Sequence, residues 1–120
     1  MDGKINITEG AAMITDKEFF MNDLERLLSS DDSGIVTTAL LDMTFNISDI
    51  DSIQSICIEM SNSPNNDIAN LAVICLGHIA RLHGAIDKTT IDFLKSKLND
   101  KRIGGSAQDA LDDIEIFVTP

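Results

Sequence analysis

The sequence predicts an all-α fold made of six main helices. Six segments place apolar residues three and four positions apart, the spacing that gives a helix one buried face. Each segment opens with a capping residue, and no segment shows the sustained alternation of apolar and polar residues that marks a strand. Because 120 residues is the length of one ordinary domain, the helices are expected to share a single core.

Three helices are expected before Pro64. The first runs from Asp16 to Ser29, and the second starts after Ser33, a good N-cap residue. Ser48 or Asp49 opens the third helix, and Pro64 stops it. The apolar stripe of the second helix consists of Val36, Ala39, Leu40 and Met43, and that of the third of Ile50, Ile53, Ile56, Cys57 and Met60.

Three more helices follow Pro64. The fourth runs from Ile68 to His83, with caps available at residues 65–67 and a left-handed stop at Gly84. Asp87 caps the fifth helix, and the sixth follows the Gly104–Gly105 pair. The residues of the last two helices that are expected to face the core are Ile91, Leu94, Leu98, Ala107, Ala110, Leu111, Ile114 and Phe117.

Apolar triplets recur along the chain. The triplet of the second helix returns 33 residues later in the fourth, and again after another 35 residues in the sixth; the members are Ile35, Ala39, Met43, then Ile68, Ala72, Leu76, then Ile103, Ala107, Leu111. The third and fifth helices match at a spacing of 38. This pattern predicts stacked helix pairs over residues 15–120, with residues 1–14 as a flexible N-terminus. An ordinary six-helix bundle with coincidental spacing is the alternative.

The charge balance limits what the protein binds. The chain has 20 acidic and 9 basic residues and a net charge of −11, which argues against a nucleic-acid backbone or an anionic membrane as partner. No apolar run approaches the ~20 residues that span a bilayer, and the N-terminus lacks the apolar stretch of a signal peptide. We therefore expect a cytoplasmic protein in which Cys57 and Cys75 are free buried thiols.

Catalytic and metal-binding groups are scarce. The chain has no Trp, no Tyr, two histidines and no phosphate-binding glycine loop. Cys75 and His78 have a spacing that suits two metal ligands, but a packed cysteine beside a surface histidine explains them better. Asp109, Asp112 and Asp113 lack the glycine turn of a calcium loop. No enzymatic activity, cofactor or metal is expected.

One stretch resembles a known family. Residues 65–117 read NNDIANLAVICLGHIARLHGAIDKTTIDFLKSKLNDKRIGGSAQDALDDIEIF, in which CLGHIARLHG and ALDDI are the most specific parts. This stretch resembles small bacterial HEAT-type repeat proteins encoded as immunity partners beside polymorphic toxins, including those of contact-dependent growth inhibition. The resemblance implies an αα-superhelix of about three HEAT-like helix pairs. Residues 1–64 fit this architecture by periodicity alone.

The resemblance also implies a binding face, because the second helix of each HEAT-type pair lines the concave side. The repeat offsets then predict three rungs across this face, Leu41/Ile74/Asp109, Thr44/Gly77/Asp112 and Phe45/His78/Asp113. The face is apolar at one end and acidic at the other. The residues expected to bind a partner are Asp42, Phe45, Ile74, His78, Arg81, Asp109, Asp112 and Asp113.

The distribution of acids suggests the nature of that partner. Between Arg26 and Arg81 there are seven acidic residues and no lysine or arginine. Such a surface complements a basic protein. Taken with the immunity function that the resemblance implies, it predicts an immunity protein that binds one copy of a basic, nuclease-like toxin domain and occludes it. A general HEAT-like scaffold for another protein or peptide, and a sensor for a small ligand or metal, are the alternatives.

Overall fold

The computed structural model describes residues 23–118, which are helical wherever they are regular. Residues 23–28 form a short helical segment, and five helices follow: α2 (Ser33–Asn46), α3 (Ile50–Met60), α4 (Asn66–His83), α5 (Lys88–Ser96) and α6 (Gly104–Phe117). No strand occurs within this part of the chain, so the all-α prediction is confirmed. The predicted flexible N-terminus and the start of the first predicted helix lie outside the described residues.

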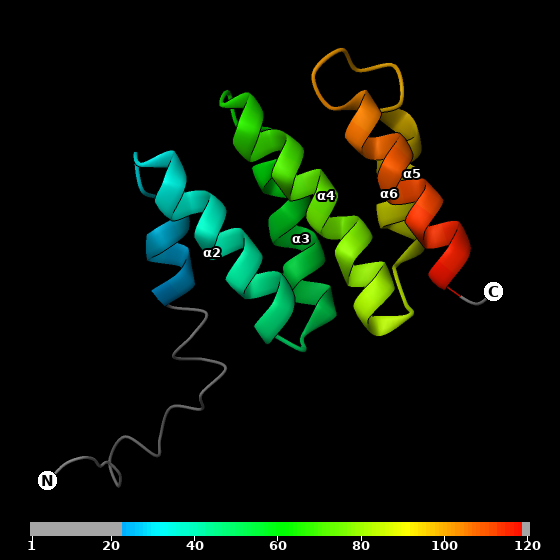
Figure 1. Ribbon diagram of the computed structural model, residues 1–120, viewed down its shortest axis with the longest axis horizontal. Coiled ribbons are helices and arrows are strands. Elements are labelled where there is room, and N and C mark those ends of the chain that lie inside the picture. Colours follow the sequence, from blue (N-terminus) through cyan, green and yellow to red (C-terminus); the bar gives the residue numbers. More distant parts are fainter. Residues whose placement is uncertain (1–22, 119–120) are drawn as a thin grey trace, which may run out of the picture.

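The helices form two layers. Figure 1 shows α2, α4 and α6 side by side in one layer, with α3 and α5 behind them. The central helix α4 packs against α2, α3 and α6, while α5 packs mainly against α6. Within residues 23–118 no helix combines the length and apolarity needed to cross a bilayer.

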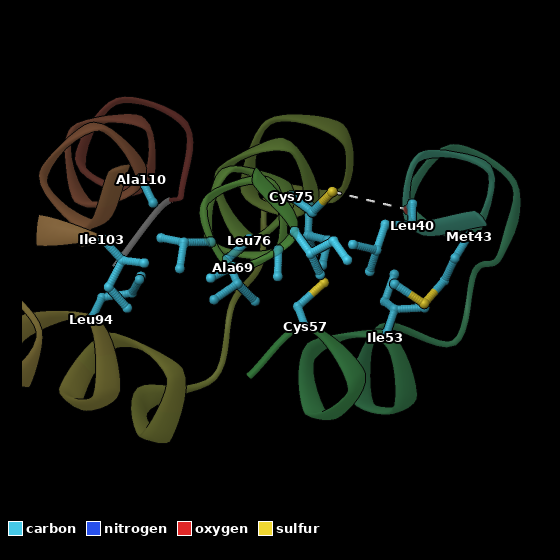
Figure 2. Packing of buried hydrophobic residues seen from close by; sticks show 14 of the residues in the cluster. Leu40, Met43, Ile53, Cys57, Ala69, Cys75, Leu76, Leu94, Ile103 and Ala110 are labelled. Atoms are coloured by element: carbon cyan, nitrogen blue, oxygen red, sulfur yellow. Dashed lines mark hydrogen bonds between the residues drawn. The ribbon is translucent and has the colours of Figure 1, made fainter. Parts of the chain in front are cut away.

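The core lies between these layers and along the seams of the first one. In Figure 2, Leu40 and Met43 of α2 approach Ile53 of α3, and Leu94 of α5 approaches Ile103 at the start of α6. The three alanines of the repeated triplet are all buried: Ala39, Ala72 and Ala107. Small side chains at these positions let neighbouring helices approach closely. In contrast, Ile35 at the head of the first triplet is 42% exposed.

Side-chain caps define the starts of α2, α3 and α4. Asp32, rather than the predicted Ser33, is the N-cap of α2, because its carboxylate accepts hydrogen bonds from the backbone N–H groups of Gly34 and Ile35. Asp49 caps α3 through the N–H of Ser52, and Asn65 caps α4 in the same manner as Asp32 caps α2.

The C-terminal ends of α4 and α3 are set by the residues that follow them. Gly84 ends α4 in the left-handed conformation, with φ 65°, as predicted. The expectation that Pro64 stops α3 is wrong, since the helix already ends at Met60 and the hydroxyl of Ser61 donates to the carbonyl of Ile58.

Two residues expected in the core are partly exposed instead. Leu98 follows the end of α5 and is 37% exposed, and Phe117 in the last turn of α6 is 46% exposed. The backbone of Leu98 lies against the start of α6. α6 begins at Gly104 itself, where a Cβ atom would lie 2.5 Å from the carbonyl oxygen of Leu98, so the two backbones touch.

A buried glutamine joins α3 to α5. Gln54 is 2% exposed, and its side-chain amide donates to the carbonyl of Ile50 at 3.0 Å. Its Oε1 atom accepts from the N–H of Asp87 at 2.9 Å and from the buried hydroxyl of Thr90 at 2.8 Å. Asp87 stands at the N-cap of α5 without a side-chain cap of its own, so Gln54 satisfies the start of that helix from a neighbouring one.

The two cysteines are buried and free, as predicted. Cys57 lies on α3 and Cys75 on α4, inside the core drawn in Figure 2. The Cys75 thiol approaches the carbonyl of Leu40 on α2 at 4.0 Å. The neighbouring Cys75 thiol, together with burial, raises the pKa of Cys57 well above its usual value, so Cys57 stays a neutral thiol in the folded protein.

Candidate functional site

The layer of α2, α4 and α6 carries an exposed apolar group. Leu41 and Phe45 on α2 are 36% and 54% exposed, and Ile74 on α4 is 38% exposed. The ring of Phe45 lies 5.5 Å from that of His78, centroid to centroid, with the planes tilted by 42°. The structure therefore brings together Phe45 and His78, as the third predicted rung required.

The third member of that rung, Asp113 on α6, belongs to a charged group on the other side of α4. Its Oδ2 atom lies 3.9 Å from an Nη atom of Arg81. The guanidinium carbon of Arg81 in turn lies 6.0 Å from the centroid of the Phe117 ring. Phe117 was expected in the core and was missing from the sequence-based site; here it supports a residue of the candidate face.

His78 connects the apolar and charged groups. Burial, followed by the positive charge of Arg81, lowers the pKa of His78, while Asp113 acts in the opposite direction. Because an ordinary histidine already titrates near pH 6.5, His78 is mostly neutral at pH 7. The centre of the face therefore offers an uncharged, half-buried imidazole beside Phe45.

The second predicted rung is wrong as a surface feature. Thr44 is fully buried and its hydroxyl donates to the carbonyl of Leu40 at 2.8 Å. Gly77 is also buried, since it lies in the seam between α4 and α6. Of this rung only Asp112 is exposed, because no described helix packs beyond α6, and its carboxylate accepts from the Gln108 side chain at 3.0 Å.

The two remaining predicted acids lie apart from each other. Asp109 is exposed on α6, one helical turn before Asp113. Asp42 instead lines a shallow depression of about 500 Å³ between Leu27 and α2. The structure thus places Asp42 beside the preceding helical segment, rather than among the α4 and α6 residues of the face.

Polar pairs fix the seam between α4 and α6. The hydroxyl of Ser106 donates to Asn70 at 2.7 Å, and the Arg102 side chain donates to Asn66 at 2.6 Å and to the carbonyl of Ser63 at 2.5 Å. These side-chain pairs are 36 residues apart, whereas equivalent positions of the two helices are 35 apart. The repeat spacing could be predicted from the sequence, but these hydrogen-bonded pairs could not. Contacts between two neighbouring helices join positions that are not equivalent in the repeat.

The described residues give no sign of a metal centre. Within residues 23–118, no group of three or more histidine, cysteine, aspartate or glutamate side chains could hold a metal ion. The surface of α2, α4 and α6 combines exposed aromatic and aliphatic side chains on α2 and α4 with carboxylates on α6. Such a combination suits the binding of another protein.

Comparison with known proteins gives a structural match. No family model matches the chain, and no curated protein matches it. Among solved structures, a chain in the crystal structure of a CDI complex from Cupriavidus taiwanensis LMG 19424 is similar to this one. The two are 27% identical, with a TM-score of 0.75, and the match covers 80% of this chain and 86% of the other. The match thus covers most of both chains.

Proposed function

We propose that this chain is the immunity protein of a contact-dependent growth inhibition system, and that it binds a cognate toxin domain and occludes its active site. The observation that carries the proposal is the similarity to a chain of a CDI complex, at 27% identity over 80% of this chain. The resemblance of residues 65–117 to HEAT-type immunity proteins supports it independently. The mechanism requires affinity and a blocked cleft, and no catalytic group.

The binding face proposed for this function is the surface of α2, α4 and α6. These helices would line the concave side of a HEAT-like superhelix, the side that helical repeat proteins use for binding. Phe45 and Ile74 are the proposed apolar anchors, since both are large and exposed. A stable complex buries about 1,600 Å² in total, and a few central anchors supply most of its affinity. Asp109 and Asp113 would pair with basic residues of the toxin next to these anchors.

The proposed toxin is a basic, nuclease-like domain bound one-to-one. The net charge of −11 and the absence of lysine and arginine between Arg26 and Arg81 support this partner. A cleft that holds a nucleic-acid backbone is lined by cations, and carboxylates can occupy it in place of phosphates. Complementary potentials would also speed association and reject toxins of other charge.

The test is an inhibition titration with the toxin domain encoded beside this chain. We expect the nuclease activity of that domain to fall linearly with added protein and to vanish at a ratio of one to one. A lysine-rich toxin domain from another system serves as the control and should keep its activity. Activity that levels off above zero under excess protein would contradict occlusion and favour a general scaffold.

A further inference from the structure

We propose that Asp113 is the receptor for one lysine or arginine side chain of the toxin, and that Arg81 holds this carboxylate only in the free protein and competes with the toxin for it. This inference rests on the function proposed above. It assigns opposite roles to two neighbouring residues of the face, one attractive and one inhibitory.

The carboxylate of Asp113 is held in place but only weakly paired. Its Oδ2 atom would lie 2.8 Å from a Cβ on Gly77, so the lack of a side chain at Gly77 creates the space that the carboxylate occupies. The Asp113 side chain keeps 30% of its surface exposed. Within residues 23–118 its ion-pair partner is Arg81, and α6 itself contains no lysine or arginine.

The ion pair with Arg81 is loose. The separation of 3.9 Å exceeds the 2.7–3.2 Å of a normal N–H···O hydrogen bond, and the Arg81 side chain is 48% exposed. Exposed pairs of this type contribute little to stability, so a competing cation can displace Arg81 at small cost. Once displaced, the Arg81 guanidinium can still form a cation–π contact with Phe117, because it already lies 6.0 Å from the centroid of that ring.

The neighbouring rings suit the stem of an incoming basic side chain. Phe45 and His78 pack together, and the Asp113 carboxylate is close enough to His78 to act on its charge. The lowered pKa of His78 keeps the imidazole neutral at pH 7. Lysine and arginine bury their methylene groups along apolar surface while the charged head reaches a carboxylate. A basic side chain crossing from the Phe45–His78 pair to Asp113 would satisfy both requirements.

Isothermal titration of the full chain with the toxin domain tests the proposal through Arg81→Gln, Asp113→Asn and the double variant. Asp113→Asn should weaken binding about 10- to 100-fold, the usual effect of losing a hydrogen bond to a charged group. Arg81→Gln should tighten binding about two- to fivefold, the strength of an exposed ion pair. In the Asp113→Asn background, Arg81→Gln should have no effect, because there is no carboxylate to release.

Glu59→Gln is the matched control, since it removes one negative charge from the exposed face of α3. It should leave the affinity within about twofold, and all variants should keep the native melting temperature within the range usual for surface substitutions. If Arg81→Gln weakens binding, Arg81 contacts the toxin directly and the competition is overturned. If Asp113→Asn binds like the native protein, the receptor role is overturned while the immunity function stands. A native chain that fails to inhibit the toxin would instead refute the proposed function itself.

Discussion

Gln54 shows how one buried polar residue can hold two helices together. Its amide group makes three hydrogen bonds in a site from which water is almost excluded. Two of these bonds satisfy groups of α5, the N–H of Asp87 and the hydroxyl of Thr90. A buried group that loses its partner costs more free energy than the bond itself contributes.

Replacing Gln54 with Leu should therefore lower the free energy of unfolding by about 1–3 kcal/mol, because the buried Thr90 hydroxyl loses its acceptor and the Asp87 N–H loses its partner on α3. Urea unfolding followed by circular dichroism measures the change. Gln108→Leu on the exposed side of α6 is the control and should change stability by less than about 0.5 kcal/mol. Equal effects from the two substitutions would mean that the buried bonds contribute nothing specific.

His78 reports on the charges around it. Arg81 lowers its pKa and Asp113 raises it, so removing each charge should move the pKa in a known direction. Arg81→Gln should raise the midpoint of His78 toward 6.5, and Asp113→Asn should lower it further. Proton NMR of the imidazole across pH 4–8 measures both shifts. Midpoints that move together in the two variants would contradict the arrangement of the three side chains.

At the scale of the helices, the seam between α4 and α6 depends on Gly77. A Cβ at this position would lie 3.3 Å from the Cα of Ala110 as well as 2.8 Å from the Asp113 carboxylate. The Ala110 contact is with backbone, so the helices would have to move apart to accept a methyl group. Overfilling of this kind typically costs 1–3 kcal/mol, more than the gain in helix propensity on replacing glycine.

Gly77→Ala should consequently destabilise the fold by about 1–2 kcal/mol in spite of its helical setting. Gly105 on α6 provides the control, because no atom lies within 4 Å of the position its Cβ would take. Gly105→Ala should leave stability unchanged or raise it by up to about 1 kcal/mol. Thermal unfolding of the two variants side by side makes the comparison, and a stabilised Gly77→Ala would show that the seam is wider than described.

Helix spacing could be predicted from the sequence because the core alternates regularly with the surface. The burial of Ala39, Ala72 and Ala107 followed directly from their recurrence. The apolar spacing could not tell a position that faces a neighbouring helix of the same layer from one that faces the solvent. The two directions differ by only about 100°, the rotation from one residue to the next along a helix. This is why Thr44 and Gly77 were placed on the face and are buried. Phe117 escaped prediction because its exposure depends on how the last described helix ends.

For the molecule as a whole, the position of its charges matters more than their number. The face of α6 carries Asp109 and Asp113, whereas Asp51 and Glu59 are exposed on α3 in the other layer. Charges spread over a surface steer a partner from a distance, but those inside an interface also decide whether it stays bound.

Reversal of Asp109 and Asp113 to Lys should weaken toxin binding about 30-fold or more, with most of the loss in the dissociation rate. The reversal of Asp51 and Glu59 to Lys changes the net charge equally and should mainly slow association. Surface plasmon resonance at low and high salt separates the two rates, since salt screens the long-range part. Equal losses of affinity from both double variants would mean that the charge acts diffusely and that the face has been assigned incorrectly.

The hydrogen-bonded Gln108 and Asp112 side chains also bear on the colloidal behaviour of the protein. By the 35-residue offset these residues are the counterparts of Val73 and Gly77, which are both buried on α4, with Gly77 packed directly against α6. The outer surface of α6 is therefore polar and charged at the positions where the surface of α4 packs against another helix. A second molecule approaching this surface would have to strip water from a carboxylate that it does not pair with. End-to-end growth of the molecules into filaments through the outer face of α6 is thus discouraged, even when the protein accumulates to high concentration.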